Sequence, residues 1–228
     1  MRLLVLGPTG VVGAEVVREA LHDARFTTVM AISRRPLAVT HPRLETLLHA
    51  DFRDFTDLRS RFSGVDAAIC ALGMAWPQAD SEAQYRAVTN DYVMALARTL
   101  NAANPEVRFC FVSGHGASAT SRQTWARIKA ETEDALRDTF GSRLVVFRPG
   151  YIYPVHGRET GYWGDTVMRP FMPFRRLLGR YITDSVTVAR ALLYAALGAA
   201  VASPAGNPQI EAASATYAVP RTHEVSSA

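Results

Sequence analysis

Three glycines near the N-terminus have the spacing of a loop that can hold a phosphate group. The segment Gly7-Pro8-Thr9-Gly10-Val11-Val12-Gly13 follows an apolar run and opens an amphipathic helical pattern. Glycines at this spacing let the backbone turn tightly, approach a pyrophosphate and pack a helix on a sheet, while the helix N-terminus donates amide hydrogen bonds. We therefore predict a dinucleotide site that Gly7, Thr9, Gly10, Val11, Val12 and Gly13 line; a purely structural turn is the alternative.

The charge at the end of the next predicted strand bears on which dinucleotide binds. An NAD site presents an acidic residue about 20 residues after the glycines, where it binds the ribose 2′-hydroxyl. Here the segment Ser33-Arg34-Arg35 stands in that place. A guanidinium pairs with a 2′-phosphate in a charge-assisted contact, so the sequence predicts NADP(H) over NAD(H). A solvated strand end is the other interpretation of the two arginines.

A second group of candidate residues follows a later apolar run. Ser113 and His115 come directly after the run, and Lys129 lies four residues after Trp125 in a helical pattern. Residues four apart share a helix face, so Lys129 is predicted to lie beside Trp125. An imidazole can act as an acid or a base, so His115 could transfer a proton, although a lone loop histidine without chemistry is the plainer interpretation.

The elements that would position these residues alternate between strands and helices. Apolar runs of strand length cover Arg2–Leu6, Thr28–Ser33, Leu44–Leu48 and residues 66–72, 108–113 and 144–148. Apolar residues at positions 85, 88, 92, 96 and 100 mark one face of a long helix. The predicted fold class is α/β, a Rossmann-type doubly wound parallel sheet with helices on both faces.

We expect one domain over residues 1–228, with residues 151–185 as a small C-terminal region that covers the substrate. A last helix is predicted at residues 186–197, and residues 208–219 are predicted to add an edge strand. The residues expected at the mouth of the site are mostly aromatic, which favours an apolar or aromatic substrate. They are Met74, Trp76, Tyr151, Tyr153, Tyr162 and Trp163.

Composition narrows the class of protein. A formal charge of +4 comes from 25 basic and 21 acidic residues that are scattered, so nucleic acid is not expected as a partner. No apolar run reaches the length of a membrane span. Cys70 and Cys110 lie in apolar runs, which predicts buried thiols, no metal site and the reducing cytoplasm. A monomer or a homodimer is expected, with a small-molecule substrate as the partner.

The ordered set of motifs resembles the short-chain dehydrogenase/reductase superfamily over roughly residues 1–200. It comprises the glycine turn, Ser33-Arg34-Arg35, Ala50-Asp51-Phe52, the segment 111–117, the lysine on the next helix and Arg148-Pro149-Gly150. The glycine turn and the last motif resemble the atypical and extended branch, which includes the epimerase/dehydratase and NAD(P)H-binding proteins.

The resemblance implies positions for the parts of a bound dinucleotide. Asp51 and Phe52 would lie along the adenine, and Ala71, Leu72 and Gly73 beside the adenine ribose. Residues at the far end would border the nicotinamide, with Lys129 bonded to its ribose. These are Pro149, Gly150 and Tyr151.

The resemblance also implies a catalytic serine followed by a Tyr-x-x-x-Lys pair. Ser113 matches the serine, with loop capping as its alternative role, and Lys129 matches the lysine. Trp125 stands at the tyrosine position, and an indole has a donor N–H but cannot titrate usefully. His115, Tyr151 or Tyr153 could supply the missing proton, or the two tyrosines could be packing residues without chemistry.

Two functions are consistent with this sequence. One is an NADP(H)-dependent oxidoreductase that resembles the flavin and biliverdin reductase type, which works without the tyrosine. The other is a non-catalytic NADP(H) sensor that resembles NmrA-like regulators and binds a protein partner. A sugar-nucleotide epimerase or dehydratase is disfavoured, because too few residues follow Arg148 for the usual substrate domain.

Overall fold

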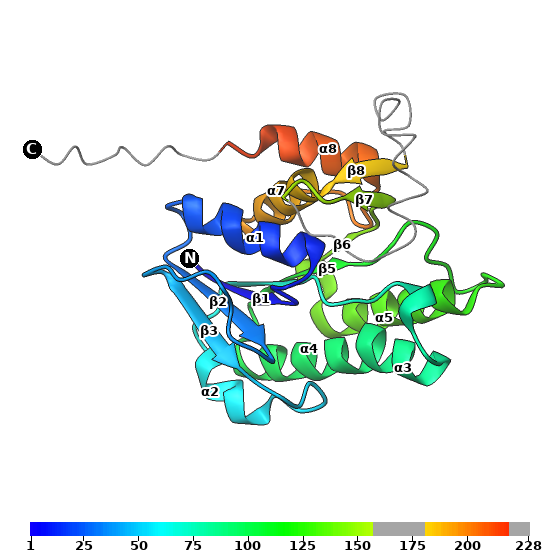
Figure 1. Cartoon of the computed structure of the whole chain (residues 1–228), viewed down its shortest axis with the longest axis horizontal. Coiled ribbons are helices and arrows are strands. Elements are labelled where there is room, and N and C mark those ends of the chain that lie inside the picture. The colour runs from blue at the N-terminus through cyan, green and yellow to red at the C-terminus, as the bar shows by residue number, and fades with distance from the viewer. Residues whose placement is uncertain (157–180, 219–228) are drawn as a thin grey trace, which may run out of the picture.

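A six-stranded parallel sheet forms the centre of the chain, in the order β3-β2-β1-β4-β5-β6 (Figure 1). The computed structural model describes residues 1–156 and 181–218. The strands are β1 (Arg2–Leu6), β2 (Thr28–Ser33), β3 (Leu44–Leu48), β4 (Ala67–Cys70), β5 (Arg108–Val112) and β6 (Leu144–Phe147). The order reverses between β1 and β4, which pair directly. Rossmann folds bind ligands at the carboxyl ends of the strands beside such a reversal.

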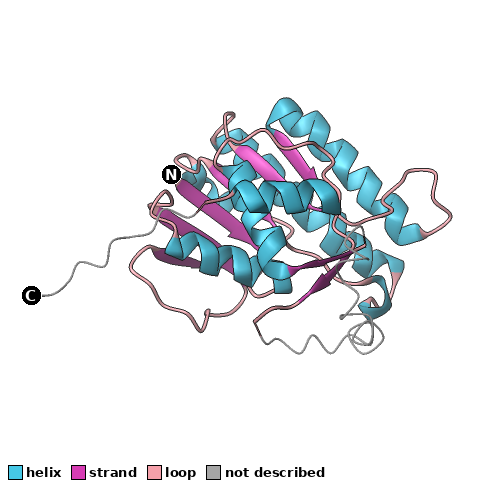
Figure 2. Ribbon diagram, turned by 90° about the horizontal axis from the view of Figure 1, so that it is seen from above, coloured by secondary structure: helices cyan, strands magenta, loops and turns pink. Residues whose placement is uncertain are grey.

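Helices cover both faces of this sheet. One face carries α1 (Val11–His22), α7 (Ser185–Ala196) and α8 (Asn207–Thr216), and Figure 2 shows helices of this side lying over the strands. The other face carries α2 (Arg59–Phe62), α4 (Tyr92–Ala103) and α5 (Thr124–Phe140), with the short α3 (Glu82–Arg86) packed against α5. Two apolar cores result, one on each side of the sheet. This arrangement confirms the predicted α/β class.

The strands were predictable because central parallel strands are apolar on both faces. The first three have the predicted bounds. The fourth is shorter than predicted, at Ala67–Cys70, and the fifth and sixth end one residue earlier than predicted. The long helix predicted from residue 85 to residue 100 contains a π-helical turn, Ala87–Asp91, between α3 and α4.

The predicted edge strand at residues 208–219 was wrong, because this segment begins as the helix α8. Pro208 lies in the first turn of that helix, where its missing N–H costs nothing. The side chain of Gln209 accepts a hydrogen bond from the Gly206 N–H at 3.1 Å, which caps the helix start. The alanines that follow are strong helix formers, so local preference opposes a strand here.

A second, two-stranded parallel sheet lies beyond β6. It pairs β7 (Tyr151–Tyr153) with β8 (Ile182–Asp184), and the sequence did not predict it. A Cβ atom on Gly150 would lie 2.2 Å from the Tyr181 carbonyl oxygen, so this close approach requires glycine. The predicted covering region 151–185 is described only at its two ends; Tyr162 and Trp163 lie outside the described residues.

The outer edge of β6 is partly occupied by residues 203–205. The Ala205 N–H donates to the Val146 carbonyl at 2.8 Å, and the Arg148 N–H donates to the Ala205 carbonyl at 2.7 Å. The Val146 N–H donates to Ser203 Oγ at 3.0 Å. The chain that leads to α8 therefore closes much of this edge of the sheet.

Cys70 and Cys110 are buried and free, as predicted. Burial raises the pKa of each thiol to about 12, so both stay protonated. Within the two described ranges, the helices are all too short or too polar to cross a bilayer.

Candidate functional site

The glycine turn connects β1 to α1 and packs against the loop that follows β4. Gly7 has φ +83°, and a Cβ there would lie within 2.9 Å of backbone atoms of Ala71 and Leu72. A Cβ on Gly13 would lie 2.0 Å from the Gly7 carbonyl oxygen. Both positions therefore require glycine, one for its backbone conformation and both for close packing.

The start of α1 fits a phosphate group. Gly10 is the N-cap residue, and no side chain caps the helix. The N–H groups of Val11, Val12 and Gly13 have no acceptor within the helix, because the first turn of any α-helix lacks them. Thr9 is exposed beside them. The turn is thus an open cradle of amide donors with a favourable helix dipole.

The residues predicted for the adenosine end lie close together. The guanidinium carbon of Arg34 lies 5.8 Å from the centroid of the Phe52 ring, and Phe52 itself is buried. Arg35 is exposed, and its N–H donates to the buried Ser33 hydroxyl at 3.3 Å. Asp51 is exposed and accepts a hydrogen bond from the Arg53 N–H at 2.9 Å.

The loop after β4 lies on the other side of the glycine turn. Its start is fixed, since the Ala71 N–H donates to the Leu6 carbonyl at 2.9 Å. Ala71 and Leu72 are half-buried, whereas Gly73 is exposed and has no heavy atom within 4 Å of its would-be Cβ. The space beside Gly73 is therefore open where the adenine ribose was predicted.

Trp125 packs on the loop that follows β5. A Cβ on Gly116, which has φ +87°, would lie 3.5 Å from the outer edge of the indole, and one on Gly114 would lie 4.0 Å away. The same Gly114 position lies 3.4 and 3.5 Å from Cδ and Cε of Lys129. The two glycines thus leave room for the indole and for the lysine stem, which lets the loop after β5 pack closely against α5.

Lys129 is half-buried, and its Nζ lies 5.8 Å from the centroid of the Phe111 ring. Within the described part of the chain it makes no hydrogen bond or ion pair. Burial lowers the pKa of this ammonium to about 8, against the opposing influence of Cys70 and Glu133. Cys70 ends β4, so the ammonium lies near the carboxyl edge of the sheet. A partner from a bound ligand would fit this place.

Ser113 is buried, and its hydroxyl donates to the carboxylate of Glu133. Arg148 binds the same carboxylate as a fork: Nε lies 3.0 and 3.1 Å from its two oxygens, and Nη2 lies 2.5 Å from Oε2. Glu133 is only 1% exposed. The hydrogen bond to Glu133 raises the pKa of Arg148. Ser113 therefore helps to fix the Glu133 carboxylate, a structural role that the sequence left open.

Backbone and side-chain contacts tie the loop after β5 to the loop after β6, where the nicotinamide was predicted. The His115 N–H donates to the Pro149 carbonyl at 2.8 Å, and the exposed His115 ring meets Tyr181 edge-on at 5.7 Å. The Gly150 N–H donates to the Asn207 side chain at 3.0 Å. Tyr151 is half-buried, and its N–H donates to the Tyr181 carbonyl at 2.8 Å.

Sequence reasoning missed Glu133, Tyr181 and the ionic role of Arg148. One signal in the sequence points to this centre: among the 25 lysine and arginine residues of the chain, Lys129 is the single lysine. An ammonium is kept here in a chain that uses guanidinium everywhere else. Glu133, one turn further along the same helix face, then becomes a natural candidate.

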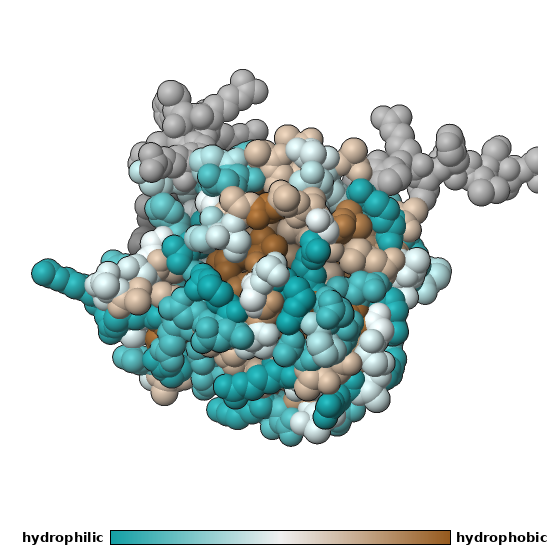
Figure 3. Space-filling model, turned by 180° about the vertical axis from the view of Figure 1, so that it is seen from behind, coloured by the Kyte–Doolittle hydropathy of each residue, from teal (hydrophilic) through white to brown (hydrophobic). Residues whose placement is uncertain are grey.

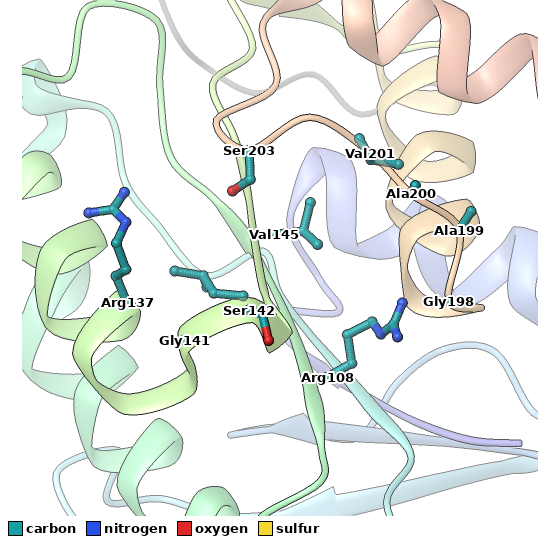
Figure 4. A pocket seen from close by; sticks show the side chains of 11 residues that line it. Arg108, Arg137, Gly141, Ser142, Val145, Gly198, Ala199, Ala200, Val201 and Ser203 are labelled. Carbon is teal, nitrogen blue, oxygen red and sulfur yellow. The ribbon is translucent and has the colours of Figure 1, made fainter.

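A hollow of about 490 Å³ lies at the opposite end of the sheet (Figure 4). It is lined by Leu144 at the amino end of β6, by the end of α5 and by residues 198–203. Arg108 on its wall donates to the Ala195 carbonyl at 3.1 Å and so caps α7. Seen from behind, the molecule shows apolar side chains gathered in a central area among hydrophilic ones (Figure 3). This hollow is separate from the carboxyl-edge site.

Comparison with known proteins agrees with this geometry. The profile of a family described as NAD(P)H-binding matches residues 7–167. Protein HTATIP2 of Rattus norvegicus is 29% identical over 196 residues, covering 84% of this chain and 79% of the relative. The mitochondrial protein FMP52 of Eremothecium gossypii is 31% identical over 166 residues, covering 72% and 71%.

Solved structures share the fold at lower identity. UDP-glucuronic acid 4-epimerase from Bacillus cereus, in complex with UDP-glucuronic acid and NAD, is 14% identical with a TM-score of 0.65 and covers 87% of this chain and 74% of its own. A short-chain dehydrogenase/reductase superfamily protein from Agrobacterium tumefaciens with bound NAD is 20% identical with a TM-score of 0.61, covering 86% and 73%. The chain belongs to the NAD(P)H-binding family.

Proposed function

We propose that this protein is an NADP(H)-dependent oxidoreductase that reduces a small apolar or aromatic substrate. The observation that carries the proposal is Lys129, the single lysine of the chain, half-buried and unpaired within the described residues. A site that needed only a positive charge could use arginine, as the rest of the chain does. A compact ammonium with a pKa of about 8 can also exchange a proton near neutrality, which a guanidinium cannot.

The choice of NADP(H) rests on Arg34 and Arg35. Both are exposed at the carboxyl end of β2, and Arg34 lies beside the Phe52 ring. A 2′-phosphate between them would gain charge-assisted hydrogen bonds, whereas no carboxylate stands there to bind a free 2′-hydroxyl. The proposed preference is tested by comparing the Kd values of NADPH and NADH in calorimetry.

A bound dinucleotide supplies the hydride, and the chain must position the substrate and deliver a proton. The Trp125 indole cannot deliver one. His115 is the best placed alternative, because its exposed ring meets Tyr181 edge-on and its backbone N–H is fixed on the Pro149 carbonyl. Tyr151 is the second candidate. The aromatic character of Trp76, Tyr153 and Tyr181, all partly exposed, supports an apolar or aromatic substrate.

Turnover is tested with NADPH and a panel of quinones, flavins and aromatic aldehydes, followed by absorbance near 340 nm. We expect NADPH oxidation with at least one of them, and we expect His115→Ala to lower kcat by about 100-fold if it is the acid. Tyr151→Phe is the matched comparison. Loss of activity in Tyr151→Phe alone would move the acid to the phenol.

The packing of Trp125 supports the second candidate function, an NADP(H) sensor that binds a protein partner. The indole fills the space above Gly114 and Gly116, where it would limit a substrate's access. A sensor would bind NADPH, reduce no member of the panel and gain no activity in Trp125→Tyr. The predicted cytoplasmic location and the monomer or homodimer state also remain proposals; cell fractionation and sedimentation test them.

A further inference from the structure

Helix α5 places Trp125, Lys129 and Glu133 on one face, each four residues from the next. A lysine and a glutamate at this spacing ordinarily pair with one another. Here they do not: the Lys129 stem lies against Gly114 and its Nζ lies over the Phe111 ring.

The Glu133 carboxylate is fully engaged by other groups. Its Oε1 accepts hydrogen bonds from the Ser113 hydroxyl and from Arg148 Nε, and its Oε2 accepts from Arg148 Nε and Nη2. Ser113 comes from the end of β5 and Arg148 from the end of β6, so two strand ends fix the carboxylate from outside the helix. A carboxylate held by a bidentate guanidinium and a hydroxyl has little capacity left for a third partner.

We propose that Arg148 and Ser113 are positioning residues for Lys129: by occupying the Glu133 carboxylate, they keep the Lys129 ammonium unpaired and available to a dinucleotide ribose. That the free ammonium of Lys129 binds a ribose rests on the proposed NADP(H) binding. That Arg148 and Ser113 keep the ammonium free of Glu133 rests on the contacts alone.

The surroundings of the ammonium fit this arrangement. Among the described residues, the titratable groups that act on it are Cys70 from β4 and Glu133 from its own helix. Cys70 stays a neutral thiol, since burial raises its pKa to about 12. Glu133 is thus the one carboxylate in the described ranges that acts on Lys129, and the Arg148 guanidinium pairs with it instead.

The single lysine makes a direct test possible. In protein labelled with 13C-lysine, the ε-carbon signal arises from Lys129 alone and follows its titration without any cofactor. We expect wild type to titrate near pH 8. In Arg148→Met the freed Glu133 carboxylate should pair with Lys129 and move the titration toward the ordinary value of about 10.4.

Two further variants distinguish an effect on the position of Lys129 from a general loss of structure. Ser113→Ala removes one hydrogen bond from Glu133 and should move the titration in the same direction by a smaller amount, and it serves if Arg148→Met does not fold. The double variant Arg148→Met/Glu133→Gln removes both charges and should return the titration to pH 8 or below. An unchanged titration in folded Arg148→Met or Ser113→Ala, or a raised one in the double variant, would overturn the proposal.

NADPH affinity at pH 7 distinguishes this proposal from the proposed function. Arg148→Met should bind NADPH about tenfold more weakly, as expected for one lost hydrogen bond to a charged group, and the double variant should recover most of that loss. If wild type binds no NADPH while the titrations shift as expected, the proposed function fails and the positioning role stands. If wild type binds NADPH and the titrations do not move, the positioning role fails alone.

Discussion

Replacing Lys129 by methionine should stabilise the protein while it removes dinucleotide binding. The ammonium is half-buried without a partner in the described residues, and its pKa falls from the unfolded value of about 10.4 to about 8. A difference of this size corresponds to about 3 kcal/mol of unfavourable interaction, and partial solvent exposure reduces it to about 2 to 3 kcal/mol. Lys129→Met keeps most of the apolar stem and removes that penalty.

The sign of the pH dependence follows from the lowered pKa. Below pH 8 both the folded and the unfolded chain carry the charge, so the penalty is fully present. Between pH 8 and about pH 10.4 the unfolded chain binds more protons than the folded chain, so the wild type gains stability as the pH rises. Above this window Lys129 is neutral in both states, and the advantage of the methionine variant should vanish.

Urea denaturation of both proteins at pH 7 and pH 10.5 measures this difference. At pH 7 we expect the free energy of unfolding of Lys129→Met to exceed wild type by about 2 to 3 kcal/mol, or roughly 4 to 10 °C in Tm for a chain of this size. Lys129→Arg is the control, because its guanidinium stays charged at both pH values. The reasoning would be refuted if Lys129→Met were less stable than wild type at pH 7. It would also be refuted if the stability difference between Lys129→Met and wild type were the same at both pH values.

Three further predictions concern other parts of the molecule. In Gly13→Ala the new Cβ would clash with the Gly7 carbonyl, so the glycine turn must shift. Calorimetry should then show the affinities for NADPH and for NADH lowered equally, each by at least tenfold. Arg34→Ala should weaken NADPH about tenfold and leave NADH nearly unchanged, whereas equal losses would remove the 2′-phosphate role. Tyr217→Phe removes a 2.6 Å hydrogen bond to buried Asp23 and should cost about 1 to 3 kcal/mol in urea denaturation. Hydrogen bonds to Arg25 and Tyr217 lower the pKa of Asp23 against its desolvation, so this cost should shrink as the pH falls below about 4.

The sheet could be predicted from sequence because its signal is local. A central strand such as β2 is apolar at nearly every position, since both its faces are covered. The tail was predicted wrongly although its alanines favour a helix, because Ile210 is the one large apolar side chain of α8 and no apolar stripe marks a helix face in the sequence. Pro208 lies in the first turn of that helix.

The site divides in the same way. Gly7, Gly10 and Gly13 were predictable because a turn imposes its demands on consecutive residues. The partners of Glu133 were not, since Ser113 and Arg148 lie 20 and 15 residues away along the chain and meet it only when two strands and a helix are assembled. The interlocking of Trp125 with Gly114 and Gly116 is likewise a property of the folded loop.

The segment that closes the β6 edge has a consequence for self-association. An exposed strand edge is a template on which another chain can add a strand, and such pairing leads to aggregates. Residues 203–205 occupy much of one edge, so β3 offers the more open one among the described strands. Along β3 stands Glu45, ion-paired with Arg61, and charged groups on an edge discourage strand addition. Removal of the chain from residue 203 onward should therefore expose the β6 edge and increase the formation of β-rich polymers, which light scattering would detect.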